Sequence, residues 1–235
     1  MGKIKKIKWF SSYSIQFILI FISVLLAFML SEWSNDREER ISELKILTEI
    51  RNSLERDLFD VESNIQGYKL SMRSSEVIED WLNKKAIPQD SINLHYQILF
   101  RNYTPIINRS AYESLKATSL KTVSNDSLRL EIISVYDYYY RILEKLEDEI
   151  YEMQDYRNHS KIVNEIISPY MQFNDELKLV GLLPAEKIDS IQEGKIKQCL
   201  WKTKQNRIFK LQQYKYVREK IKELKAEIEK ELKKE

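Results

Sequence analysis

The side chains best suited to metal or acid–base chemistry are two histidines, His95 and His159, in a chain with 36 acidic residues. Glu152, Asp155 and His159 are spaced three and four residues apart, so a helix would place them on one face, where they could share a metal ion. Di-iron bundles use a Glu-x-x-His pair on each of two helices, and neither histidine has a glutamate three residues before it. We therefore expect a solvated polar face, with no metal site and no cofactor.

Motifs for nucleophilic or phosphate chemistry are missing from the sequence. Only four glycines are present, and no serine nucleophile elbow or glycine-rich phosphate loop occurs. Cys199 is the single cysteine, which excludes an internal disulfide, and its expected role is that of a small buried apolar residue. We expect no enzymatic activity, no catalytic residue and no small-molecule substrate. The alternative is an envelope hydrolase whose carboxylates converge in a cleft.

Four tyrosines are concentrated at one place, Tyr136, Tyr138, Tyr139 and Tyr140, on an expected helix. Such close neighbours point in several directions, so some must line a second contact, with another helix, a partner or a ligand. Tyrosine suits both wet grooves and cores, because it combines a large apolar area with a hydroxyl group. Core packing is the favoured interpretation, and an aromatic groove is the alternative.

Three Asp-Ser-aliphatic tripeptides, at 90–92, 126–128 and 189–191, look like the O-glycosylation motif of some exported bacterial proteins. Each also lies where a helix could begin, and Asp or Ser as the N-cap residue explains the pattern without modification. We favour capping over glycosylation.

The elements that position these residues begin with an apolar run over 15–30, in which Gln16 and Ser23 are the polar exceptions. No charge lies within 9–31, so the run is long enough to cross a bilayer as a helix. We predict a transmembrane helix over 12–33. Its interfacial anchors are the aromatic residues at the two ends, Trp9, Tyr13 and Trp33.

Charge sets the orientation of this helix. Four lysines lie in the segment 1–11, whereas acidic and basic residues mix on the other flank. The positive-inside bias therefore predicts that 1–11 is cytoplasmic and that 34–235 is exported. A cleaved signal peptide is the alternative, but the run is long and 30–32 offers no small-residue cleavage pattern.

One face of the predicted membrane helix carries small or polar residues at spacings of three and four. Such stripes allow helices to approach closely or to hydrogen-bond within the membrane. The same residues are also tolerated facing lipid, and both interpretations stay open. The contact stripe consists of Gln16, Ser23, Ala27 and Ser31.

The chain beyond the membrane helix is patterned as helices. Apolar residues recur every three or four positions over 41–65, which predicts an amphipathic helix, continuous with the anchor and kinked at Gly67. Shorter helices are predicted over 91–101 and 110–120.

The second half of the sequence predicts a long helix over 126–167 with a break near 158–160, then an irregular region over 173–194. A last helix runs from Lys204 and carries a coiled-coil-like apolar seam. The predicted fold is therefore all-α, with one N-terminal transmembrane helix followed by an elongated antiparallel helical bundle.

Composition agrees with a folded helical chain. It is 43% hydrophobic and 31% charged, and it has only four prolines, which favours long helices over disorder. The 38 basic residues nearly balance the acidic ones, so nucleic acid is not an expected partner.

Two segments resemble a family of uncharacterised bacterial single-pass membrane proteins, known as a domain of unknown function. Residues 26–34 are similar to the end of the family's apolar helix, and 108–116, followed by Leu128 and Tyr136, are similar to its central motif. Gln16 and Ser23 stand where the family often has Glu and Gly. The resemblance implies an anchor and exported helices, and no mechanism. Its central-motif residues here are Asn108, Ser110, Ala111, Tyr112 and Leu115.

Together these features predict a non-enzymatic accessory or scaffold protein of a bacterial inner membrane, with a cytoplasmic N-terminus and a periplasmic C-terminal domain. Its expected partners are the membrane itself and another membrane protein or a second copy of the chain. The alternative is a periplasmic ligand-sensing bundle that signals through a partner by moving the membrane helix.

Overall fold

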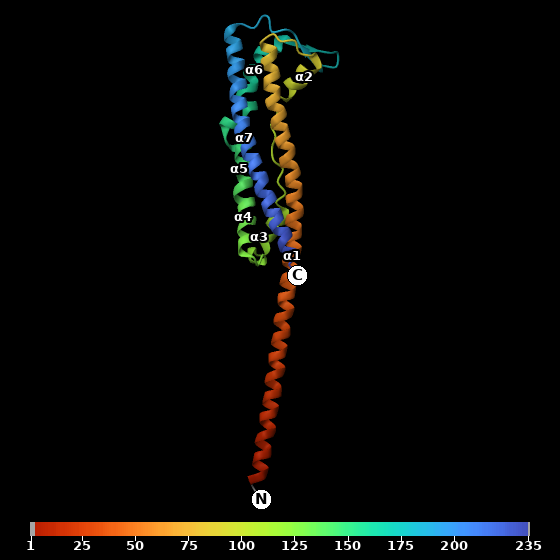
Figure 1. Ribbon diagram of the computed structural model, residues 1–235, viewed down its shortest axis with the longest axis vertical. Coiled ribbons are helices and arrows are strands. Elements are labelled where there is room, and N and C mark those ends of the chain that lie inside the picture. Colours follow the sequence, from red (N-terminus) through yellow and green to blue (C-terminus); the bar gives the residue numbers. More distant parts are fainter. Residues whose placement is uncertain (1–2, 235) are drawn as a thin grey trace.

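The computed structural model describes the backbone of residues 3–234 and the side chains of residues 15–234. The molecule is mostly helical, and two long helices, α1 (Lys3–Leu82) and α7 (Ser190–Glu231), pack side by side and antiparallel. With 80 and 42 residues, they are about 120 Å and 63 Å long. Figure 1 shows that the bundle surrounds the C-terminal half of α1, while its N-terminal half projects away from it.

The apolar N-terminal segment and the first bundle helix are one element, since α1 passes through residue 33 without a helix end. Gly67 does not end the helix, since α1 stays helical up to Leu82. Gly67 instead allows close packing: a Cβ there would clash with the ring of Tyr103. The helix ends where Lys84 adopts a φ of 61°.

After α1, the chain turns back along it. Helix α2 (Gln89–Ile98) packs on the end of α1, and an extended segment then returns to α3 (Ser110–Thr118) and the 3₁₀ turn η1 (Leu120–Thr122) near the base of the bundle. The prediction of two short helices is confirmed, although α2 begins two residues earlier than expected.

Over the described residues, 3–234, no strand pairs with the extended segment, and side chains of α1 take up many of its backbone hydrogen bonds. Asp57 and Asp60 accept from the backbone N–H groups of Asn108 and Ile106, both at 2.9 Å. Further along α1, polar side chains donate to the carbonyl oxygens of residues 98, 103 and 104. This polar ladder continues with Asn64, Tyr68 and Ser71.

The segment 126–170 forms the third rod of the bundle, but not as the single helix predicted. The backbone turns extended at Ile150, with a ψ of 101°, and leaves the helical region again at Gln154, with a ψ of 74°, so the break precedes the expected one near 158–160. Three π-helical turns also interrupt it. Its parts are α4 (Asp126–Ser134), η2 (Val135–Tyr139), α5 (Tyr140–Glu144), η3 (Lys145–Glu149), η4 (Tyr151–Met153), η5 (Tyr156–Ser160), α6 (Lys161–Ile167) and η6 (Ser168–Tyr170).

The all-α prediction is wrong at the far end of the bundle, where β1 (Met171–Phe173) and β2 (Leu179–Leu182) form an antiparallel hairpin. Its strands are too short to produce a clear alternating pattern in the sequence. The side chain of Gln89 bonds both the N–H and the carbonyl of Leu182, at 3.0 and 3.1 Å, and so closes the outer edge of β2.

Helix α7 begins at Ser190 rather than at Lys204. Asp189 forms a capping box: its carboxylate accepts from the N–H groups of Ile191 and Gln192, at 2.9 and 2.8 Å. The other two Asp-Ser motifs do not cap in this way, because Asn125 is the N-cap residue of α4 and Pro88 that of α2.

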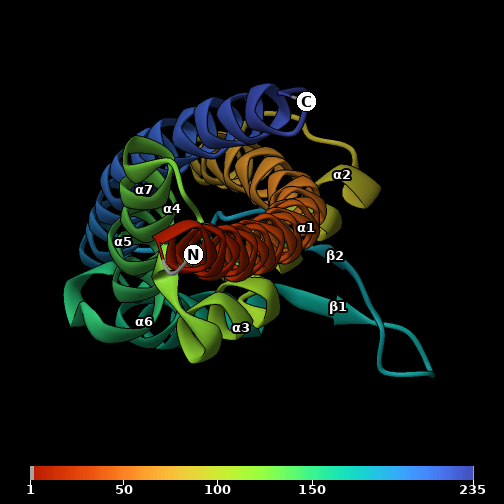
Figure 2. The same cartoon turned by 90° about the horizontal axis from the view of Figure 1, so that it is seen from below.

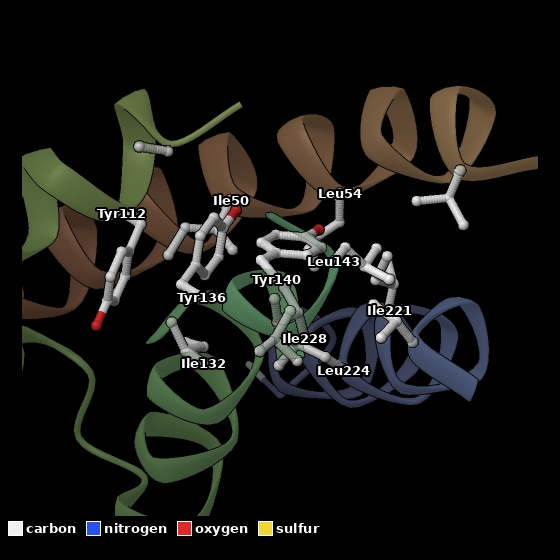
Figure 3. Close-up of a cluster of buried hydrophobic side chains, with 14 of the residues drawn as sticks. Ile50, Leu54, Tyr112, Ile132, Tyr136, Tyr140, Leu143, Ile221, Leu224 and Ile228 are labelled. Carbon is white, nitrogen blue, oxygen red and sulfur yellow. The ribbon is translucent and has the colours of Figure 1, made fainter. Parts of the chain in front are cut away.

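Two hydrophobic clusters fill the bundle. The lower core lies nearer the N-terminal half of α1 and contains the predicted seam of α7, from Tyr214 to Ile228, packed against α1, α3 and α4. The upper core lies at the far end, where Trp81, Leu99 and Ile167 pack with residues of β2 and α7. Figure 3 shows part of the lower core between α1 and α7.

Candidate functional site

The N-terminal half of α1 is the one helix, in the part of the chain that the structure describes, long and apolar enough to cross a membrane. Every side chain over 15–39 is exposed, including Phe17 at 70% and Leu30 at 66%. A helix that is apolar on all sides needs an apolar environment around it. The side chains of Trp9 and Tyr13 lie outside the described residues.

The contact stripe of Gln16, Ser23, Ala27 and Ser31 lies on this exposed helix. The Ser23 hydroxyl donates to the carbonyl oxygen of Leu19, four residues earlier, at 2.8 Å. Its hydrogen-bonding need is therefore met within α1, as a lipid environment requires.

Trp33 is 61% exposed at the other end of the apolar segment, and the Arg37 guanidinium lies 5.6 Å from its ring centroid. An aromatic ring beside a cation is typical of the polar boundary of a bilayer.

A polar junction joins α1 to the C-terminal end of α7 where α1 enters the bundle. Arg40 donates to the carbonyl oxygens of Lys234 and Glu231, at 2.8 and 3.3 Å, and pairs with Glu43 at 2.6 Å. The last carbonyls of a helix lack partners and carry partial negative charge, so a guanidinium stabilises them. The other Glu43 oxygen accepts from the N–H and hydroxyl of Ser124, at 2.7 and 2.8 Å.

The predicted tyrosine group divides between core and surface. Tyr136 stacks on Tyr112 at 4.5 Å and meets Tyr140 edge-on at 5.2 Å in the lower core (Figure 3). Tyr138 is 61% exposed, and Tyr139 is half-buried against the surface. The four tyrosines therefore do not line one groove.

The family-like motif lies beside the buried pair of tyrosines. Ala111, Tyr112 and Leu115 are buried in the lower core, while the Ser110 hydroxyl donates to the side-chain oxygen of Asn108 at 2.8 Å. The motif thus joins α3 to α1 and to the third rod, which is a packing role.

Asp57 links that motif to the tyrosines. Its carboxylate accepts from the Asn108 N–H and from the Tyr140 hydroxyl, the latter at 2.7 Å. Burial raises the pKa of Asp57 from 3.8 to about 6, against the lowering effect of these hydrogen bonds. The Tyr136 hydroxyl nearby is buried and has no hydrogen-bond partner among the residues that the structure describes.

A buried charge cluster separates the two cores. Glu147 pairs with Lys210 at 2.7 Å, and both side chains are nearly inaccessible. The Tyr68 hydroxyl donates to the second Glu147 oxygen, and the Tyr68 and Tyr214 hydroxyls both donate to the carbonyl of Tyr103, at 3.2 and 3.1 Å. Burial raises the pKa of Glu147, although Lys210 opposes this shift.

Arg207 extends the cluster one helical turn along α7. Its guanidinium donates to the carbonyl oxygens of Ser71, at 3.1 Å, and Leu99, and lies 4.0 Å from Asp155. Burial lowers the pKa of Arg207. The one sequence signal for this cluster is that residues 207 and 210 share the spacing of the apolar seam that begins at Tyr214.

The residues considered for metal chemistry do not converge. Glu152 is exposed and pairs with Lys202, whereas Asp155 is buried, 3.6 Å from His159. Among the described residues, no group of three His, Cys, Asp or Glu side chains could hold a metal ion. Cys199 is buried, and burial raises the pKa of its thiol.

Comparison of the chain with protein-family models, curated proteins and solved structures found no match. The functional proposal therefore depends on the surfaces and clusters described above.

Proposed function

We propose that this chain is a single-pass protein of a bacterial inner membrane that acts as an accessory or scaffold protein, through contacts with another membrane protein or with a second copy of itself. One observation carries the proposal: residues 15–30 are apolar and exposed all around a helix that continues into a folded bundle. Burying one large apolar side chain contributes about 1.5–3 kcal/mol, so a run of them strongly favours insertion into lipid.

The spacing between membrane and bundle supports this assignment. Ten residues separate Leu30 from Arg40, which corresponds to about 15 Å of helix. The polar layer of each leaflet is roughly 5–8 Å thick. The base of the bundle would therefore stand just outside the headgroups, with Trp33 among them.

The orientation follows from the lysine-rich N-terminal flank, which the positive-inside bias keeps in the cytoplasm. The bundle is then periplasmic, as the family resemblance also implies.

The surroundings of the buried ionisable groups favour a contact role over catalysis. Asp57 and Glu147 are both occupied by internal hydrogen bonds or ion pairs that join α1 to other elements. Groups used in this way join elements of the fold and are withdrawn from solvent and substrate.

A ligand-sensing bundle is the second candidate, and the junction at Arg40 favours it. Because α1 is continuous and is bonded there to the end of α7, a rearrangement of the bundle would be felt by the membrane helix. A sensor requires an effector on the cytoplasmic side, whereas a scaffold requires a partner at fixed stoichiometry.

The test is extraction of the full chain in gentle detergent, followed by mass spectrometry of copurifying proteins. We expect recovery of a membrane protein or a second copy at a fixed ratio. Ala27→Leu enlarges the contact stripe and should lower that ratio, whereas Leu25→Ala, off the stripe, is the matched control. Recovery of a lone monomer would contradict the proposal.

A further inference from the structure

The far end of the bundle carries an arm with exposed apolar side chains. Figure 2 shows the β1–β2 hairpin projecting sideways from the bundle, with its strands running across the long axis of the molecule. Leu177 at its turn is 83% exposed, and Phe173 and Val180 on its strands are 53% and 43% exposed. Exposed apolar side chains gathered on one projection are typical of a contact surface.

Leu177 occupies a backbone position that does not favour leucine. Its φ of 58° is in the left-handed region, where glycine or asparagine is normally found. The turn is held without its side chain, since the Asn174 side-chain oxygen accepts from the N–H groups of Glu176 and Lys178, at 3.1 and 2.9 Å. Leu177 strains the backbone, and the turn does not need its side chain. We therefore expect that side chain to contact another molecule.

An apolar groove of about 650 Å³ lies beside the same hairpin. It opens at the level of the arm, because Met171 and Phe173 of β1 form one of its walls. The opposite walls come from the region of α2 and from the third rod, through Tyr96, Phe100 and Tyr156.

The hairpin also has an open edge. In the part of the chain that the structure describes, β1 pairs only with β2, while side chains of α2 cover the other side of β2. The outer edge of β1 therefore offers backbone groups to another strand.

A second copy of the chain would contact the arm, the groove and the open edge of β1 at the same time. Copies anchored by the same helix hold their hairpins at one height above the membrane, because α1 is continuous. Since the strands lie across the long axis, a two-fold axis along that direction would set two β1 edges antiparallel. Each arm would then point toward the neighbouring bundle.

We propose that two copies dimerise through this arm, with β1 paired to β1 and the Leu177 side chain of each copy filling the groove of the other. The inference rests on the proposed function, because the shared height depends on the membrane anchor. It names a second copy as the contact partner at this surface.

The test is the molar mass of the full chain in detergent, measured by light scattering over a concentration series. A dimer is expected, and Leu177→Gly should raise its dissociation constant by at least about a hundredfold, because two buried leucines are lost. Leu177→Gly should leave the melting temperature unchanged or raised, since glycine relieves the left-handed backbone. Leu130→Gly, at an exposed α4 position remote from the arm, should leave the dissociation constant unchanged.

A cysteine pair tests the strand contact. In a Cys199→Ser background, Gln172→Cys on β1 should form a disulfide-linked dimer in oxidised membranes, and Lys215→Cys on α7 should not. A monomeric wild-type chain, a Leu177→Gly dimer of full strength, or equal crosslinking at the two positions would each overturn the dimer.

Alkaline extraction of the same membranes distinguishes failure of the dimer proposal from failure of the proposed membrane function. Release of the chain into the soluble fraction would contradict the anchor. A retained but monomeric chain would contradict only the arm-mediated dimer.

Discussion

The lower and upper halves of the bundle are closed in different ways. The lower core is one large cluster whose apolar side chains are covered by three rods and whose base is sealed by the Arg40 junction. The upper core is smaller, and the hairpin beside it exposes apolar side chains such as Phe173 and Leu177. The lower half is therefore closed on its sides and at its base, whereas the apolar half of α1 and the arm both expose apolar side chains.

The buried charge cluster marks the boundary between these halves. Apolar seams allow two long helices to slide by a turn, whereas the Glu147–Lys210 pair is satisfied in one register only. The surface pair of Glu62 with Arg218, at 2.9 Å, instead lies between α1 and α7. The cluster therefore specifies how α7 and the third rod align.

The largest effect is expected from breaking this cluster. Glu147→Ala leaves the Lys210 ammonium buried without its carboxylate, which should lower the free energy of unfolding by about 3–5 kcal/mol. Thermal and denaturant unfolding of the full chain in detergent measure this change.

Two controls sharpen that result. Glu219→Ala removes a carboxylate from exposed ion pairs that water and salt screen, and should change stability far less than Glu147→Ala does. Replacing both members of the buried pair, with Glu147→Leu and Lys210→Met, should restore much of the lost stability. Equal losses for Glu147→Ala and Glu219→Ala would contradict a special role for the cluster.

Asp57 provides a pH-dependent test within the lower half. Its carboxyl group has a pKa of about 6 when folded, against an ordinary value of 3.8, so folding takes up a proton between these values. The stabilising contribution is complete below pH 4 and is lost as the pH rises through 6, by at most about 3 kcal/mol. Asp57→Asn cannot titrate, so its stability should depend less on pH over this window. Parallel wild-type and variant curves would contradict the prediction.

A smaller effect on stability is expected when two helical glycines are replaced by alanine, and its sign should differ between them. Gly67→Ala places a Cβ against the Tyr103 ring and should destabilise the chain by about 1–3 kcal/mol. Gly194→Ala, with open space around its Cα, should stabilise it by up to about 1 kcal/mol. Opposite shifts in melting temperature are expected, and a stabilising Gly67→Ala would show that the ring moves aside without cost.

Much of the helical architecture was predictable, because long amphipathic periods are strong signals. The seam from Tyr214 to Ile228 predicted a buried face of α7, and Ser110 was correctly placed at the start of α3. The start of α7 was missed because Gly181, Pro184 and Gly194 suggested a loop. The local capping box at Asp189 outweighed them.

Tertiary hydrogen bonds account for what the sequence did not reveal. Buried polar residues of α1, such as Asp57 and Ser71, interrupt its apolar pattern because a distant extended segment needs their hydrogen bonds. Likewise, nothing local to Glu147 identifies Lys210 as its partner 63 residues away. The exposed apolar helix over 15–30, by contrast, could be predicted from its composition alone.

Labelling of single cysteines tests the central claim, that one helix anchors the chain and the bundle lies outside. In a Cys199→Ser background, Lys215→Cys and Lys5→Cys would be treated with a membrane-impermeant maleimide in spheroplasts. We predict that position 215 is labelled in intact spheroplasts and position 5 only after permeabilisation. Labelling of position 215 that requires permeabilisation would contradict the account.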